Sequence, residues 1–177
     1  MIEAAAISAA GAAGAAGIGT WVATPSNGQE WLWKKYELLD KVEKASNAIF
    51  AATLRGMCNF LVCGNNAARV VRQLGEHFKP APGLDKVVPT GPIVLGKLDG
   101  RTVIQDPFLT TNRIIYGYRG DNYLYAGFMY APYIPLFATP TITLANLESQ
   151  KGFLSSAGFK VINAGLFTFG TVDVSGL

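Results

Sequence analysis

Between residues 29 and 55 the hydrophobic positions recur at the spacing of an amphipathic helix, and Gly56 is a plausible end for it. Trp31 and Trp33, near the start of the helix, are expected in the core; contact with another subunit is the alternative. The other side chains expected on the apolar face are Leu32, Tyr36, Leu39, Val42, Ser46, Ile49 and Thr53.

The next segment alternates short apolar runs with turn signals. The run NFLVC at 59–63 predicts a buried strand, and NNAARVVRQL at 65–74 predicts a short helix that opens with a good cap. HFKPAPGLDKVVPTG, residues 77–91, is expected to be an exposed loop. After it, IVLGKLDGRTVIQDP predicts a hairpin around Asp99 and Gly100, because this pair tolerates positive φ at low cost.

The most apolar stretch is DNYLYAGFMYAPYIPLF, residues 121–137, which Pro132 and Pro135 interrupt. It is too interrupted for a membrane helix and too apolar for an ordinary surface loop. Strand-like runs with frequent glycine follow it toward the end of the chain. Because helices come early and strands late, the sequence predicts an α+β fold.

Composition adds a hint of assembly. The 177 residues fit one domain, or one domain with an extension. Half of them are hydrophobic and only 15% are charged, against about 25% in typical domains, which suggests that other chains cover part of the surface. The net charge of +3 comes without a basic run, so a nucleic-acid reader is not indicated. Residues 1–28 predict a flexible, Ala/Gly-rich lead-in without the basic start of a signal peptide.

Candidate chemistry is sparse. His77 is the single histidine of the sequence, so a histidine-based metal cluster is not expected, and no phosphate-binding or nucleophile-elbow motif is present. Cys58 and Cys63 are expected as reduced core residues; a cysteine-dependent enzyme would instead need a thiol that reacts quickly. We therefore expect neither an enzyme nor a cofactor site.

The order of these segments resembles a known family. NFLVCGNNAARVVRQL, GKLDGRTVIQDP, IIYGYRGDNYLYAGFMYAPYIPLF and KGFLSSAGFKVIN follow one another as in the carboxy-terminal part of the major capsid proteins of T-even-like tailed phages, which have the Hong Kong 97-type fold. The resemblance covers roughly residues 35–168, and its most telling motifs are 117–120 and 126–136. Members are usually far longer, so the resemblance implies a fragment or a reduced form.

The resemblance implies a division into an axial domain and part of a peripheral domain. Residues 59–129 would form the axial-type domain, and 29–58 the helix of the peripheral or spine region. Residues 130–177 would supply a return strand and the peripheral sheet. A strand that crosses between domains is covered on both faces, which would explain the missing polar alternation, and its prolines are tolerated where it bends or leaves the ladder.

The function that the resemblance implies is structural. The chain would self-assemble into hexamers and pentamers of an icosahedral virion shell that encloses DNA, after assembly in the host cytoplasm. Other capsid or decoration proteins are possible partners, DNA contact would be non-specific, and no membrane is involved. Loops at the ring centre, TTNR or RGDN, would meet their copies. A soluble module that binds a protein through its aromatic strands is the alternative. The expected interface residues are Arg113, Arg119, Asp121, Tyr130 and Tyr133.

Overall fold

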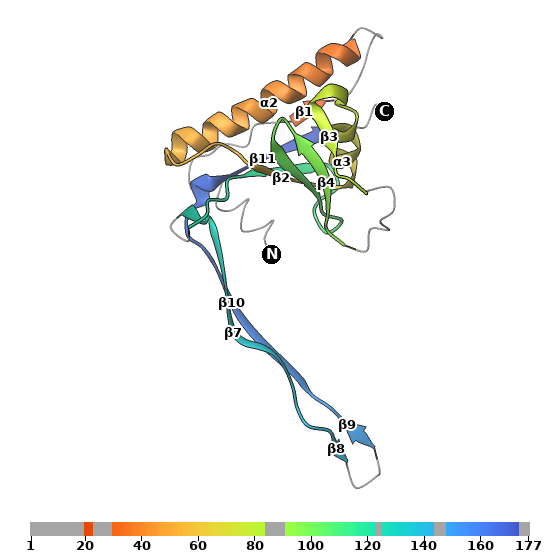
Figure 1. Ribbon diagram of the computed structural model, residues 1–177, viewed down its shortest axis with the longest axis vertical. Helices are drawn as coiled ribbons and strands as arrows, with labels where there is room; N and C mark the ends of the chain where they lie inside the picture. Colours follow the sequence, from red (N-terminus) through yellow and green to blue (C-terminus); the bar gives the residue numbers. More distant parts are fainter. Residues whose placement is uncertain (1–19, 23–29, 84–90, 123–124, 144–147, 174–177) are drawn as a thin grey trace. The chain divides into compact units, whose positions relative to one another are not determined.

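The computed structural model describes five segments of the chain, residues 20–22, 30–83, 91–122, 125–143 and 148–173, with the side chains of 30–32 left out. The chain divides into two units (Figure 1). Unit 1 comprises residues 1–127 and 163–177, and unit 2 comprises residues 128–162. The described elements mix helices and strands, so the α+β class is confirmed.

Unit 1 is built on a seven-stranded mixed sheet in the order β1-β11-β6-β2-β5-β4-β3. The pairs β1–β11 and β2–β5 are parallel, and the other pairs are antiparallel. Its strands are β1 (Thr20–Val22), β2 (Phe60–Cys63), β3 (Phe78–Pro80), β4 (Ile93–Leu98), β5 (Arg101–Gln105), β6 (Arg113–Gly117) and β11 (Phe167–Asp173). Its helices are α2 (Glu30–Thr53) and α3 (Asn65–Arg72), with short 3-10 turns η1 (Gly75–His77) and η4 (Ala164–Leu166).

Helix α2 confirms the predicted helix, and Val42, Ser46 and Ile49 of the predicted apolar face are buried, but Tyr36 of that face is not. Tyr36 is 54% exposed and Trp33 is 74% exposed, so the prediction of both as core residues is wrong. The buried stripe instead begins at Leu38, which lies about 200° around the helix from Tyr36. Trp31 and Leu32 fall among the side chains that the structure does not describe. The buried residues of the stripe are Leu38, Val42, Ala45, Ser46 and Ile49.

Strand β1 ties part of the expected lead-in to the sheet. Trp21 is 1% exposed, and its indole N–H donates a hydrogen bond to the Lys34 carbonyl oxygen at 2.9 Å. Lys41 Nζ donates to the Thr20 carbonyl oxygen at 2.7 Å. Residues 20–22 are therefore a packed edge strand instead of a flexible lead-in, because Trp21 buries a large apolar surface against α2. The rest of 1–28 lies outside the described residues.

The predicted strand at 59–63, the helix at 65–74 and the hairpin are confirmed as β2, α3 and β4–β5. Asp99 (φ 45°) and Gly100 (φ 85°) make the turn, both with the positive φ that the tight hairpin requires. The segment 77–91 differs in part from the predicted loop. Its start forms β3, which pairs antiparallel with β4 and places Phe78 at the core, while residues 84–90 lie outside the described segments.

Unit 2 is a long two-stranded antiparallel ribbon of β7 (Phe128–Ala138) and β10 (Phe153–Val161). A second short pair, β8 (Ile142–Thr143) with β9 (Ser149–Gln150), follows at its end (Figure 1). Within the described segments β7 has one partner strand and no packed layer, so the expectation that the rest of the chain covers the strand at 130–137 on both faces is wrong there. Two strands alone form no core, so their apolar side chains stay exposed.

Candidate assembly surfaces

The first β-bulge of the ribbon lies at Tyr133 of β7. Pro132 is paired with Ala157 of β10. Ser156, which precedes Ala157 in β10, is paired with Ile134. Tyr133 is therefore an extra residue on the β7 side. A bulge accommodates such a residue, and it tolerates a neighbouring proline because the ladder is interrupted there.

A second bulge follows three residues later. Between the pair at Ile134 and the pair at Phe137, β7 advances by three residues while β10 advances by two. The extra residue falls at Pro135–Leu136, again beside a proline. Each proline of this strand thus lies at or next to a break in the ladder, in agreement with the sequence prediction, and the two extra residues let the eleven residues of β7 match the nine of β10.

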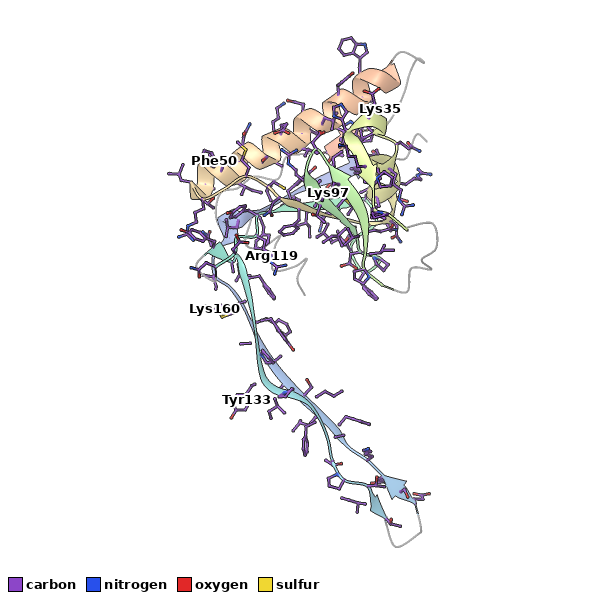
Figure 2. All side chains as sticks on the ribbon, in the orientation of Figure 1. Lys35, Phe50, Lys97, Arg119, Tyr133 and Lys160 are labelled. Carbon is purple, nitrogen blue, oxygen red and sulfur yellow. The ribbon has the colours of Figure 1, made fainter. Side chains whose placement is uncertain are left out.

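The bulges carry the most exposed apolar side chains of the ribbon. Tyr133 is 84% exposed and Leu136 is 74% exposed, and Tyr133 projects away from the ribbon in Figure 2. Tyr130 is paired with Phe159, and their rings lie 5.2 Å apart between centroids, yet each ring is more than half exposed. Cross-strand contact therefore orders these rings without burying them.

Charge is almost absent from unit 2. Across residues 128–162 the sequence holds three charged residues, Glu148, Lys151 and Lys160. Monomeric proteins seldom expose a contiguous apolar patch of this kind, and such patches mark interaction sites. The large apolar residues of unit 2 that are more than half exposed are Tyr130, Tyr133, Leu136, Phe137, Ile142, Phe153, Leu154 and Phe159.

Arg119 and Asp121 lie together on an exposed turn of unit 1 that Asn59 holds in place. Asn59 Nδ2 donates to the Arg119 carbonyl oxygen at 2.7 Å, and the Arg119 N–H donates to Asn59 Oδ1 at 2.9 Å. Gly120 is needed in this turn, because a Cβ there would lie 2.4 Å from Tyr125 Cβ. The turn is fixed through its backbone, so the Arg119 side chain stays exposed for contact.

Arg113 lies apart from that turn, at the start of β6. Its guanidinium stacks over the Phe169 ring of β11, 5.6 Å from the centroid. The TTNR loop before it packs on the start of α3: the Thr111 carbonyl oxygen accepts the N–H groups of Asn66 and Ala67. This oxygen satisfies helix donors where no side-chain cap is present, so the expected asparagine cap is replaced by a loop carbonyl.

The five predicted interface residues therefore fall into separate groups. Arg119 and Asp121 share one turn, Arg113 is partly buried at the start of β6, and the two tyrosines lie on the ribbon. Sequence reasoning missed Asn59, because nothing local links it to a backbone sixty residues away. The sequence did offer one signal for the bulges. Pro132 and Pro135, each followed by a large apolar residue, interrupt the strand three residues apart.

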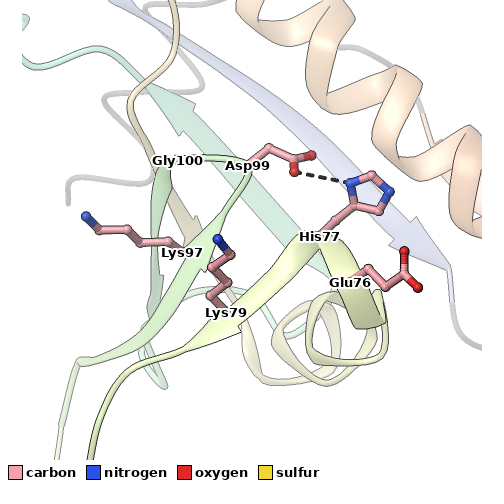
Figure 3. A pocket seen from close by; sticks show the side chains of 6 residues that line it. All are labelled: Glu76, His77, Lys79, Lys97, Asp99 and Gly100. Carbon is pink, nitrogen blue, oxygen red and sulfur yellow. Dashed lines mark hydrogen bonds and ion pairs between the residues drawn. The ribbon is translucent and has the colours of Figure 1, made fainter.

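A shallow hollow lies beside the β4–β5 turn (Figure 3). His77 Nδ1 lies 3.1 Å from Asp99 Oδ1, and Lys79 is paired directly across the strands with Lys97. Like charges in such a pair repel. Lys79, Lys97 and Asp99 are exposed and His77 is partly exposed, and nothing in the hollow resembles a nucleophile with its base. The lining residues are Glu76, His77, Lys79, Lys97, Asp99 and Gly100.

Both thiols are buried and unpaired with each other. Burial raises the pKa of the Cys63 thiol to about 12, and Cys58 nearby adds to the effect. Burial also raises the pKa of Cys58, although the backbone hydrogen bond at Gly117 opposes the shift. A thiol that stays protonated is a poor nucleophile, so this environment is that of a core cysteine.

Two further site classes find no support within the described segments. No group of three or more metal-binding side chains is found there. No described helix is long and apolar enough to cross a membrane. The surfaces that remain are the apolar ribbon and the turn at Arg119, and they define a protein with interaction surfaces for other chains.

Comparison with known proteins identifies the family. The family model described as Major capsid protein Gp23 matches residues 1–171. The chain therefore belongs to the Major capsid protein Gp23 family, a family of structural proteins and not of enzymes, as the sequence predicted.

The curated relatives are phage proteins. The chain is 28% identical over 157 residues to the major capsid protein of Vibrio phage KVP40, covering 84% of this chain and 30% of that protein. It is 34% identical over 113 residues to the major capsid protein of Salmonella phage ViI, covering 60% of this chain and 26% of that protein. The chain thus spans between a quarter and a third of the length of these relatives.

Among solved structures, the likenesses are distant. A putative capsid protein of a prophage of E. coli CFT073 matches with a TM-score of 0.44 and 9% identity, over 77% of this chain and 47% of that one. A chain from a structure titled Mycobacterium phage Patience matches with a TM-score of 0.39 and 12% identity, over 80% and 46% of the two chains.

Proposed function

We propose that the chain forms part of an icosahedral phage shell and self-associates into its hexamers and pentamers. Such a shell encloses the DNA genome of the virion. Family membership supports this function, since the relatives that are similar in sequence are named major capsid proteins. The proposal extends to the mature virion as the place where the chain resides and to the host cytoplasm as the place of assembly.

The exposed apolar ribbon is the observation that carries the proposal. An aromatic side chain contributes ~150–250 Å² when it is buried. Eight large apolar residues of unit 2 are more than half exposed, so they offer on the order of 800 Å², which is about what each partner contributes to a standard interface. Unit 2, with three charged residues, would aggregate unless a specific neighbour covered it.

We infer the Hong Kong 97-type division into axial and peripheral parts with shifted boundaries. Residues 59–127 form the core of the axial-type domain, two residues fewer than the sequence predicted. Strand β11 pairs with β6, and α2 packs on the same sheet, which supports adding 29–58 and the end of 130–177 to that domain. The ribbon at 128–162 is then the peripheral-type part.

In this arrangement the two surfaces have different tasks. Arg119 and Asp121, on their exposed turn, would make polar contacts between neighbouring copies around a ring. Tyr130 and Tyr133 would anchor apolar contacts between rings or within one. Arg113 is a weaker candidate than the sequence suggested, because its guanidinium already stacks on Phe169. Decoration proteins and a non-specific contact with DNA remain proposed partners.

Light scattering after gel filtration, with negative-stain images of each peak, tests the proposal. Rings or shells of identical copies are expected. A monomer of 18.9 kDa that binds a different protein specifically would overturn self-association for this chain. It would favour the alternative, a binding module that uses the same ribbon.

A further inference from the structure

We propose that the open edge of β10 pairs antiparallel with β10 of a second copy of this chain, centred on Ala157. The proposal rests on the proposed self-association and specifies one of its contacts. Among the described residues, β10 has β7 on one side and no strand on the other. An unpaired strand edge presents a row of backbone N–H and C=O groups, which is a template for another strand.

The two edges of the ribbon differ in their capacity for pairing. Pro132 and Pro135 each remove an N–H donor from β7, and the two bulges break its regular spacing. Strand β10, in contrast, contains no proline, and the extra residues of both bulges lie on β7. Prolines and bulges protect an edge from strand addition, so β7 is the blunted edge and β10 is the open one.

The length of β10 favours a second β10 as its partner. In the described segments, the outer strands of the seven-stranded sheet are β1 and β3, with three residues each, and β3 ends in Pro80. Strand β10 has nine residues, Phe153–Val161, and Ala157 is the middle one. Antiparallel pairing about Ala157 therefore uses the whole strand in both copies, and it gives a closed two-fold contact.

Charge and side-chain size agree with this register. The centre of β10 reads Ser155-Ser156-Ala157-Gly158, so small side chains would meet there. Lys160, the single charged residue of the strand, would lie opposite Leu154 of the other copy, where its alkyl stem can pack. A parallel arrangement in register would instead bring two lysines side by side, which is unfavourable.

The pairing would also stabilise the ribbon itself. An isolated two-stranded ribbon is marginal in water, and the pair of copies would form a four-stranded sheet in the order β7-β10-β10-β7. Phe153 would lie opposite Val161 of the other copy, a favourable aromatic and β-branched pair. Because Phe153, Ala157 and Phe159 lie on one face of β10, the joined sheet would carry two phenylalanine rings of each copy on that face, with small side chains between them.

Disulfide formation in the full-length chain tests the register. In Ala157→Cys, the two introduced thiols would face each other with Cα atoms about 4.5–5.5 Å apart, within the range of a disulfide. We expect a covalent dimer on mild oxidation, at least tenfold faster than in the matched control Phe153→Cys. In the control the two introduced thiols would be about 26 Å apart, eight residues along the strand. Wild-type protein gives the background from the buried native thiols.

A mixture of Phe153→Cys and Val161→Cys supplies the confirming arm, because these positions would face each other only in the proposed register. Equal rates for Ala157→Cys and Phe153→Cys would overturn the inference, as would a mixture that forms no heterodimer. If the wild-type chain forms rings or shells while Ala157→Cys cross-links no faster than Phe153→Cys, another occupant covers β10 and the proposed function stands. A wild-type chain that stays monomeric, with no cross-links in the variants, would overturn both the β10 pairing and the proposed self-association.

Discussion

Asn59 holds the backbone of Arg119 at both of its polar groups, although the two residues are sixty positions apart in the sequence. The side-chain amide donates to the Arg119 carbonyl oxygen at 2.7 Å and accepts from the Arg119 N–H at 2.9 Å. Asn59 directly precedes β2, and Arg119 follows β6, its antiparallel neighbour. The clamp therefore closes the end of this strand pair and presents the 118–122 turn.

Removal of the clamp should cost stability, whereas removal of the arginine side chain should not. We expect Asn59→Ala to lower the free energy of unfolding by about 1–2 kcal/mol, because two hydrogen bonds are lost. Arg119→Ala keeps both bonds, since they are made to its backbone, and is the matched control. Urea unfolding followed by circular dichroism measures both. Equal losses in the two variants would show that the side chain of Arg119 is what matters.

Charge reversal at the same turn should affect assembly and leave folding intact. Arg119→Glu keeps the Asn59 clamp but inverts the exposed charge, so we expect fewer particles and an unchanged melting temperature. Particle yield from negative-stain counts and light scattering is the readout, with Arg119→Lys as the charge-preserving control. An unchanged particle yield in Arg119→Glu would remove this turn from the proposed contacts.

The two bulge side chains should anchor assembly. The double substitution Tyr133→Ser with Leu136→Ser removes the most exposed apolar side chains of β7 but keeps both prolines and the bulges. We expect the assembled fraction to fall at least tenfold, because hot spots at interfaces are large apolar anchors. Tyr36→Ser with Trp33→Ser, on the exposed face of α2, removes similar exposed surface elsewhere. Equal losses in the two doubles would mean that general solubility, not the ribbon, determines assembly.

The contact between Gly64 and the TTNR loop should tolerate no side chain. A Cβ at Gly64 would lie 2.2 Å from the Thr110 carbonyl oxygen, a backbone atom that cannot rotate away. We expect Gly64→Ala to destabilise the fold by about 1–3 kcal/mol through overpacking. Gly91→Ala, where a Cβ meets nothing within 4 Å, should be close to neutral. Thermal unfolding of both variants is the test, and a neutral Gly64→Ala would contradict the packing of this loop.

The buried thiols predict a loss of stability in alkali. Burial raises the pKa of Cys63 from 9.0 to about 12 and also raises that of Cys58. Between these pH values the unfolded chain releases the Cys63 proton while the folded chain keeps it, so stability is full below pH 9 and falls as the pH rises toward 12. One such group contributes a slope of about 1.4 kcal/mol per pH unit. Unfolding in urea from pH 8 to 11 measures it.

Cys63→Ala should reduce the slope of the free energy of unfolding against pH by the contribution of one proton, whatever its effect on absolute stability. The same protection should keep both thiols slow toward iodoacetamide at neutral pH in the folded protein and fast in urea. Rapid alkylation of the native chain would contradict the burial of both cysteines and reopen the case for a reactive thiol.

The local pattern of the sequence determined most elements of the sheet unit. The helix α2, the strand β2, the helix α3 and the turn at Asp99 and Gly100 follow from periodicity and turn chemistry, which act over a few residues. The order of the quoted segments, with 117–120 and 126–136 as the most telling motifs, likewise indicated the family, because the spacing of their glycines, aromatics and prolines is specific. Such signals need no knowledge of what lies across the fold.

The tertiary structure decided which faces are buried and which strands are neighbours. Tyr36 satisfied a helical period as well as Leu38 did, and only the position of the sheet selected Leu38 for burial. Likewise β11 inserts between β1 and β6, and Asn59 reaches Arg119, through contacts that no local pattern encodes. The apolar run at 128–138 had to be covered by something, but whether its cover came from the same chain depended on a second layer. The described fold supplies no such layer, and this leaves the ribbon exposed for another chain.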